Sequence, residues 1–251
     1  MSYQIITDSC CDLTDAQLKN LQVSCANLTV LYNGENHSNF SDPAAVKAFY
    51  DELRTGVMAT TAAANPDDWA NIMLPALKEG KDVLVLAFSS GLSTTYQSAV
   101  IASNDLLEEY PDRKIIVVDT LCAALGQGLL VWHACKHRDA GESLAEVTAW
   151  VEANKLHMCH WVTVEDLNHL KRGGRVSAAT AMVGTMLNIK PIISVSEEGK
   201  LVSTSKVRGR KAAMDLITKK VADATDKEMV FIGHGDCPED AEVCAKILKE
   251  K

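Results

Sequence analysis

The stretch DVLVLAFSSGLSTTYQ, residues 82–97, contains the pattern that decides the fold of this 251-residue chain. It opens with a near-continuous apolar run, residues 82–88, passes through a loop rich in serine and threonine, and enters a helix that closes before Pro111. A second apolar run, residues 114–118, follows that helix. Such runs are typical of strands in a parallel sheet that is covered on both faces.

The same alternation of strand and helix extends in both directions through the first half of the chain. It predicts a doubly wound α/β domain with right-handed crossovers. Capping residues support the helix starts, and glycines follow two of the helix ends. The other elements predicted here are strands over 3–7 and 23–32, helices that begin at Thr14, Asp42-Pro43 and Asn65-Pro66, and helices over 121–139 and 143–154.

The second half has a different pattern, centred on a hairpin with arms 189–196 and 200–207 that turns at Glu198-Gly199. Antiparallel pairing through a tight turn predicts a mixed α/β domain. We place the boundary near residue 158, which gives an N-terminal domain over 1–158 and a C-terminal domain over 159–251. The remaining predictions are a strand over 156–164, a short helix ended by Gly173-Gly174, helices over 178–187 and 209–224, a strand over 229–234 and a helix from Pro238.

Composition excludes several classes of protein. No apolar stretch reaches the 18 or so residues of a membrane span, and the N-terminus lacks a signal-peptide pattern, so we expect a cytoplasmic protein. The eight cysteines are spread along a chain large enough to fold without disulfides, and none forms a Cys-x-x-Cys pair. Most are therefore expected to be reduced core thiols.

Charge is unevenly distributed along the chain. A net charge of −8 argues against general nucleic-acid binding. Residues 171–211, however, hold nine basic residues and only two acidic ones. A local positive surface of this kind is suited to an acidic partner or an anionic ligand, although a solvated surface explains it equally well.

The loop over residues 89–95 is the most informative candidate site. Helix starts offer unpaired N–H groups and a favourable dipole to a carboxylate or phosphate, and Ser93 and Thr94 add hydroxyl groups. The alternative is simple N-capping by Ser93 or Thr94. Thr60-Thr61 forms a second hydroxyl-bearing turn before a helix, which alone decides nothing.

None of the fourteen glycines belongs to a nucleotide phosphate loop or to a dinucleotide-binding fingerprint. A metallophosphoesterase site is the chemical alternative, because hard cations prefer several carboxylates in one shell. Its candidate ligands are Asp8, Asp12, Asp119, His234 and Asp236.

Taken together, several motifs resemble one family, the DegV proteins, which include the fatty-acid-binding subunits of bacterial fatty acid kinase. The order and spacing of these motifs, almost end to end along the chain, make the set specific. The matching segments are residues 6–9 with Asp12-Leu13, Thr60-Thr61 before Pro66, 89–93 with Thr95-Tyr96, Val118-Asp119, 126–128, 166–175, 187–191 and 206–212.

The resemblance implies a two-domain α/β protein of the EDD fold that encloses a long-chain fatty acid between its domains. It also implies a lipid-binding subunit that is not an enzyme and that needs no cofactor beyond the bound fatty acid. The carboxylate is expected near Thr61 and Ser93. A separate ATP-dependent kinase would convert that carboxylate to an acyl phosphate. The residues that by similarity face this kinase are Arg175, Lys206, Arg208 and Arg210.

The chain departs from the family pattern at the head-group site. Ala62 stands where the family usually has a hydroxyl residue, Thr94 replaces a common glycine, and Ala124 replaces a frequent serine. We expect Thr94 to compensate for the thinner set of hydrogen bonds around Ala62.

The chain also stops at Lys251, without the family's Gly-x-His-x-Gly-Pro-Gly segment, so the C-terminal domain is expected to be incomplete. Two rivals to the lipid carrier stay open at this point. One is a phosphoesterase or phosphotransfer enzyme using Asp8, Asp119 and His234, and the other is a regulatory module that binds proteins through the basic segment.

Overall fold

The computed structural model describes residues 2–38, 42–165, 167–176 and 188–250. The chain divides into two compact units, Met1–Met158 and Cys159–Lys251. The helix predicted over residues 178–187 lies outside the described residues. Within the described part of the chain, no helix has the length and apolar character needed to cross a membrane.

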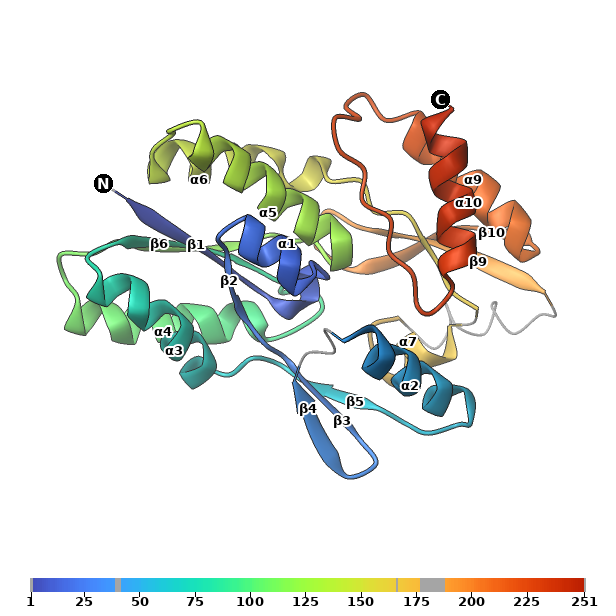
Figure 1. Ribbon diagram of the computed structural model, residues 1–251, viewed down its shortest axis with the longest axis horizontal. Helices are drawn as coiled ribbons and strands as arrows, with labels where there is room; N and C mark the ends of the chain where they lie inside the picture. Colours follow the sequence, from blue (N-terminus) through green and yellow to red (C-terminus); the bar gives the residue numbers. More distant parts are fainter. Residues whose placement is uncertain (1, 39–41, 166, 177–187, 251) are drawn as a thin grey trace. The chain divides into compact units, whose positions relative to one another are not determined.

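The first unit is built on a four-stranded parallel sheet in which β6 pairs with both β1 and β7. Helices α3 and α4 cover one face, and α5 and α6 lie on the other (Figure 1). The predicted doubly wound α/β fold is therefore confirmed. In sheet order the strands are β2 (Ser24–Ala26), β1 (Tyr3–Asp8), β6 (Asp82–Ala87) and β7 (Ile115–Asp119). The helices are α1 (Asp15–Asn20), α3 (Pro66–Lys78), α4 (Thr95–Glu109), α5 (Ala124–Asp139) and α6 (Leu144–Asn154).

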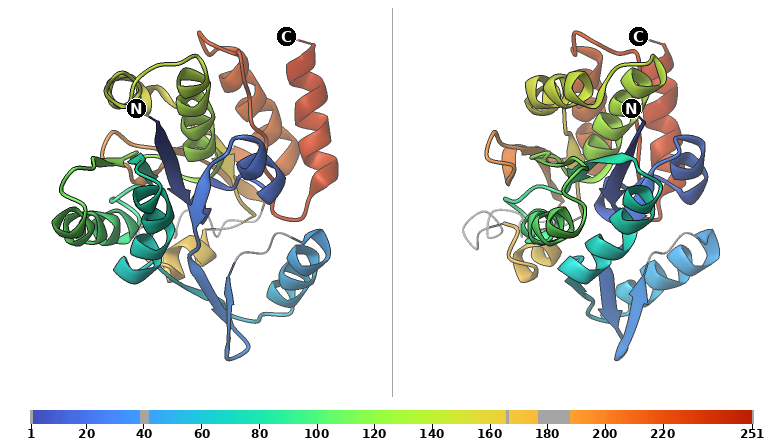
Figure 2. Two further views of the ribbon diagram at one scale, coloured as in Figure 1. Left: turned by 60° about the vertical axis from the view of Figure 1, so that its left-hand side comes forward. Right: turned by 90° about the vertical axis from the view of Figure 1, so that its left-hand side faces the viewer.

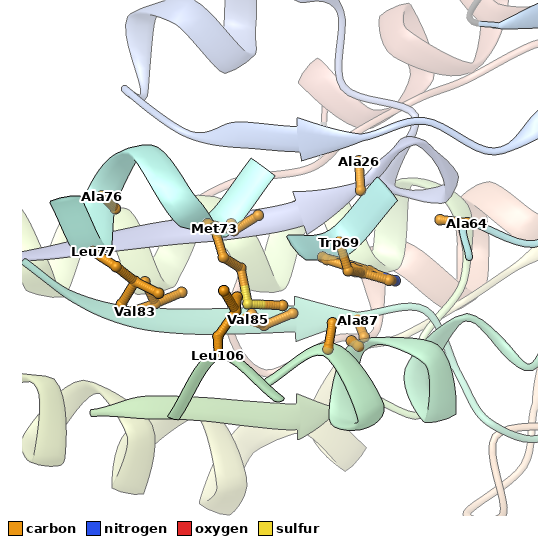
Figure 3. Close-up of a cluster of buried hydrophobic side chains, with 13 residues drawn as sticks. Ala26, Ala64, Trp69, Met73, Ala76, Leu77, Val83, Val85, Ala87 and Leu106 are labelled. Atoms are coloured by element: carbon orange, nitrogen blue, oxygen red, sulfur yellow. The ribbon is translucent and has the colours of Figure 1, made fainter. Parts of the chain in front are cut away.

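Strand β6 is apolar over almost its whole length because it supplies side chains to both layers of helices. Val83 and Val85 join a buried cluster with Trp69 and Met73 of α3 (Figure 3). Leu84, which alternates with these valines, is also fully buried but faces the opposite side of the sheet. Burying one such side chain is worth about 1.5–3 kcal/mol relative to exposure, so a buried strand favours apolar residues at every position.

The helix starts follow the capping residues read from the sequence. The Thr14 hydroxyl accepts from Gln17 N at 3.2 Å, while Gln17 Oε1 accepts from Thr14 N at 2.9 Å. Asn65 and Asp68 make the same reciprocal pair at the start of α3. These capping boxes satisfy N–H groups that the first helical turn leaves unpaired.

The strand predicted over residues 23–32 is wrong as one element, because the chain changes sheets within it. β2 completes the parallel sheet, but Leu28 N then donates to the Ser9 hydroxyl at 3.0 Å instead of continuing the ladder. β3 (Thr29–Tyr32) forms a hairpin with β4 (Glu35–Ser38), which the sequence analysis did not predict. Its turn residues Asn33 and Gly34 have φ angles of 53° and 79°, a conformation that an Asn-Gly pair favours.

The Thr60-Thr61 segment, predicted as a turn, is strand β5 (Thr60–Ala62), which pairs with β3 to give a three-stranded sheet in the order β4-β3-β5. Helix α2 (Pro43–Arg54) is joined to this sheet by an edge-to-face contact between Tyr32 and Phe49, whose ring centroids are 5.0 Å apart. Figure 2 shows the hairpin and α2 from two further directions.

The second unit contains the predicted hairpin. β9 (Ile189–Val195) and β10 (Leu201–Arg208) pair antiparallel, and Gly199 in the turn has a φ of 69°. β8 (Val162–Thr163) pairs with the other edge of β9. The helices of this unit are α7 (Asn168–Arg172), α9 (Arg210–Ala222) and α10 (Pro238–Lys249). α7 ends at the predicted Gly173-Gly174, α10 begins at the predicted Pro238, and α9 lies within the predicted range 209–224.

Two strand predictions in the second half are wrong. Residues 156–164 form a short 3-10 turn, η2 (Lys155–His157), and only the two-residue strand β8. Residues 229–234 have no regular structure, and Val230 and Ile232 remain 37% and 38% exposed. An apolar β-branched run forms a strand only where a neighbouring strand offers its N–H and C=O groups, and the described residues supply none here.

Candidate ligand-binding site

The candidate site starts from the loop between β6 and α4, residues 88–94, at the carboxyl edge of the parallel sheet. Because β6 lies between β1 and β7, the loop is flanked by Asp8 and Asp119 at the ends of those strands. Asp8 Oδ2 accepts from Phe88 N at 2.7 Å, and Asp119 Oδ1 accepts from Ser90 N at 3.1 Å. The two carboxylates therefore hold the loop from both sides.

Asp8 is fully buried, and three elements supply its hydrogen bonds. Besides Phe88 N, it accepts from Cys10 N at 3.0 Å and from Gln127 Nε2 at 3.3 Å. Burial raises the pKa of Asp8 to about 6, and the hydrogen bonds from Phe88, Cys10 and Gln127 oppose that rise. The carboxylate is thus occupied by protein donors.

The phosphoesterase alternative finds no support in this geometry. Asp119 Oδ1 also accepts from Leu121 N at 3.2 Å, so both strand-end carboxylates serve as backbone acceptors. His234 lies in the second unit, where its Nδ1 accepts from Cys237 N at 3.2 Å. Among the residues that the structure describes, no group of three or more His, Cys, Asp or Glu side chains is arranged to hold a metal ion.

The start of α4 leaves hydrogen-bond donors available. The Ser93 hydroxyl accepts from Thr95 N at 3.2 Å and lies 2.8 Å from Thr95 Oγ1. Thr94 is exposed and its side chain makes no capping bond. Within the described ranges, the N–H groups of Tyr96 and Gln97 have no acceptor. Capping by Ser93 is thus real, but it satisfies only the first N–H group of the helix.

Thr61 and Ala62 lie on exposed strand β5, where they pair with Val30 and Thr29 of β3. The chain that follows them turns inward, because Ala64 is fully buried in the cluster around Trp69. Figure 3 shows Ala64 and Trp69 near Ala87, the last residue of β6.

Trp69 ties this segment to the start of α4, because its Nε1 donates to Thr95 O at 3.1 Å. No hydrogen bond joins Thr61 to Ser93 in the described structure. The two predicted head-group residues therefore lie in the same unit, and the described residues show no hydrogen bond between them.

The basic residues expected at a partner surface differ in their surroundings. Lys206 and Arg208 lie on the exposed face of edge strand β10, and Arg175 is exposed beyond α7. Arg210, at the start of α9, instead forms ion pairs with Asp240 of α10 and with Glu165. The Asp240 carboxylate, helped by Glu165, raises the pKa of Arg210 further above its usual value. Arg210 therefore has a role inside its own unit.

The role of Gln127 was not predicted from the sequence, and its side chain is fully buried. Its Nε2 donates to Thr7 Oγ1 at 3.0 Å and contacts Leu86 O and Asp8 Oδ2, both at 3.3 Å. The signal was present in Gly126-Gln127-Gly128, because a polar residue between two glycines on an apolar helix face indicates close packing. A Cβ on Gly128 would lie only 2.5 Å from Cys11 O.

Comparison with known proteins identifies what this arrangement is similar to. The model of the DegV family, described as an uncharacterised protein family, matches residues 2–251. A DegV domain-containing protein of Clostridium perfringens is 40% identical over 253 residues, which cover 99% of this chain and 87% of that protein.

Two solved structures are also similar. One is described as fatty acid binding of a DegV family protein from Thermus thermophilus, with 33% identity, a TM-score of 0.76 and coverage of 89% of this chain and 79% of that one. The other is a DegV lipid binding protein from Thermotoga maritima, with 26% identity, a TM-score of 0.84 and coverage of 100% and 88%.

Proposed function

Because the chain belongs to the DegV family, we propose that it binds a long-chain fatty acid and holds the carboxylate at the start of α4. The observation that carries this proposal is the set of unpaired N–H groups of Tyr96 and Gln97 beside the Ser93 hydroxyl. Thr95 Oγ1 can donate to Ser93 Oγ, which leaves the Ser93 hydroxyl proton for a ligand oxygen. Fatty acid binding by the Thermus relative supports the same ligand class.

The acyl chain and the carboxylate contribute differently to this binding. Each methylene group removed from water is worth about 0.8 kcal/mol, so a long acyl chain supplies most of the affinity. The hydroxyl and N–H groups at the start of α4 then fix the position of the carboxylate. By family resemblance, Thr61 contributes a second hydroxyl and no cofactor is needed. Thr94 departs from the family pattern, and we expect its hydroxyl to compensate for Ala62.

A substitution at Ser93 tests this site. Purified protein is examined by native mass spectrometry, and oleate affinity is then measured for Ser93→Ala beside Ser98→Ala. Ser98 lies further along α4, and its side chain has no hydrogen bond to any described residue. A hydrogen bond to a charged group is worth about 1.5–3 kcal/mol, so we expect Ser93→Ala to weaken binding by at least about tenfold. Equal affinity for the two variants would refute the placement of the carboxylate.

The partner is the second part of the proposal. We propose that the protein is not itself an enzyme, that it acts in the cytoplasm, and that it presents the fatty acid to a separate ATP-dependent fatty acid kinase. Lys206 and Arg208 on β10, together with Arg175, provide the exposed positive charge for that contact. Arg210 supports the surface by fixing α9 to α10.

Charge reversal separates partner binding from lipid binding. The Lys206→Glu, Arg208→Glu double variant should bind oleate as the wild type does but form less acyl phosphate with a purified fatty acid kinase subunit and ATP. Lys219→Glu, on the exposed side of α9, serves as the charge control. Full acyl phosphate formation by the double variant would contradict this docking surface, and phosphatase activity of the isolated protein would revive the enzymatic alternative.

A further inference from the structure

The fixed donors around Asp8 show how the loop is held in place. Thr7 Oγ1 donates to Leu86 O at 2.8 Å, so Thr7 must accept from Gln127 Nε2. This contact fixes the orientation of the Gln127 amide, whose nitrogen then also faces Asp8 Oδ2. The carboxylate of Asp8 is therefore aligned from α5 before it accepts from Phe88 N.

Among the described residues, no basic side chain contributes to the electrostatics of Asp8. The titratable groups that interact with Asp8 are two thiols, Cys10 next to the end of β1 and Cys25 on β2, and neither supplies positive charge. A buried carboxylate without a cation is costly unless its oxygens are occupied by donors. The interaction with Phe88 N is thus part of what makes this burial possible.

The two strand-end carboxylates use their oxygens differently. Asp8 engages both oxygens, with Oδ1 on Cys10 N and Oδ2 on Phe88 N and Gln127. Within the part of the chain that the structure describes, Asp119 engages only Oδ1, which accepts from both Ser90 N and Leu121 N. An asparagine at position 119 can therefore reproduce the contacts of Asp119 through its amide oxygen. An asparagine at position 8 would instead turn its NH₂ group toward one of the N–H donors that Asp8 accepts from.

We propose that Asp8 and Asp119 are positioning residues, a loop clamp that fixes the β6–α4 loop through Phe88 N and Ser90 N so that the start of α4 presents its donors to the ligand carboxylate. This inference rests on the proposed function, and it assigns the two acidic side chains a role as acceptors for the backbone. Neither residue touches the ligand in this account. Their effect is transmitted through the conformation of the loop.

The test compares conservative and truncating variants in two measurements. Oleate affinity is determined for Asp119→Asn, Asp119→Ala and Asp8→Asn, with Asp105→Asn on the exposed side of α4 as a control for lost charge. Amide hydrogen exchange at Phe88 and Ser90 is followed by NMR in the ligand-free proteins. The exchange rates report whether the hydrogen bonds from Phe88 N and Ser90 N are formed when no ligand is bound.

We expect Asp119→Asn to retain an oleate affinity within about twofold of the wild type. Asp119→Ala and Asp8→Asn should weaken oleate binding about tenfold, which corresponds to one or two lost hydrogen bonds. Exchange should accelerate at Ser90 in Asp119→Ala and at Phe88 in Asp8→Asn. The proposal is overturned if Asp119→Asn loses as much oleate affinity as Asp119→Ala. It is also overturned if Asp119→Ala keeps both the oleate affinity and the Ser90 amide exchange rate of the wild type. If the wild type takes up no oleate, the proposed function fails and the exchange rates alone decide the clamp.

Discussion

Gly128 lies at a close approach between α5 and the turn that follows β1, and a methyl group there should force the two apart. A Cβ at this position would lie 2.5 Å from Cys11 O and 3.1 Å from Leu13 Cδ2. The nearer atom belongs to the backbone, so it cannot move aside by a side-chain rotation. Gly128→Ala is therefore expected to shift α5 or the 3-10 turn η1 (Ser9–Cys11).

Two opposing effects determine the size of the change. Alanine is favoured over glycine within a helix by about 0.8–1.0 kcal/mol, which alone would stabilise the variant. Overpacking of a buried site costs about 1–3 kcal/mol, and contact with a backbone atom and Leu13 together puts this site at the upper end. We expect a net loss of about 1–2 kcal/mol in the free energy of unfolding.

Thermal unfolding followed by circular dichroism measures this loss. For a chain of this size, 1 kcal/mol corresponds to about 2–4 °C, so the midpoint should fall by about 2–8 °C. Gln127 sits next to Gly128, so amide exchange at Phe88 should accelerate in the same variant. An unfolding midpoint equal to or above that of the wild type would refute the overlap argument.

Three further predictions concern the same unit. Trp69→Phe should lower the free energy of unfolding, measured by chemical denaturation, by about 2 kcal/mol, because it removes the hydrogen bond to Thr95 O and leaves a void. Trp132 is only half-buried, so Trp132→Phe should lower the free energy of unfolding less. Asn65→Ala removes the N-cap of α3 and should lower the free energy of unfolding by about 1 kcal/mol in the same denaturation experiment. An unchanged free energy of unfolding would contradict this prediction. Folding raises the pKa of Asp8 from 3.8 to about 6, so the folded protein binds the proton of this carboxyl more tightly than the unfolded chain does. The stability gained from that proton is present at low pH and is lost as the pH rises through 6. The stability of the wild type relative to Asp8→Asn should therefore be about 1 kcal/mol greater at pH 5 than at pH 7, and a flat difference would contradict the raised pKa.

Several errors of the sequence analysis share one physical cause. The segment over residues 23–32 was predicted as a single strand because its apolar pattern continues, yet Leu28 bonds to Ser9 and the chain changes sheets. Val230 and Ile232 are typical strand residues, yet they remain more than one third exposed outside any strand. In both segments the outcome depends on which backbone groups lie alongside, and that information is not local.

Much of the candidate site was predictable from the chain alone. The hydroxyl-rich loop after β6, the strand-end positions of Asp8 and Asp119 and the start of α4 all follow from local pattern. The use of the two carboxylates as acceptors for Phe88 N and Ser90 N does not, because it requires β1, β6 and β7 to be neighbours. The metal alternative finds no support among the described residues, because both carboxylates accept from backbone N–H groups.

The sequence by itself determined the α/β class, the doubly wound alternation of strands and helices in the first unit, the approximate bounds of the described helices and the hairpin of β9 and β10. These properties depend on periodicity, capping and turn residues, which act over a few positions. Only the tertiary structure decided that Gln127 aligns Asp8, that Arg210 joins α9 to α10, and that Gly128 permits the approach of α5. These contacts join residues far apart in the chain, and their partners become defined only once the strands and helices have packed.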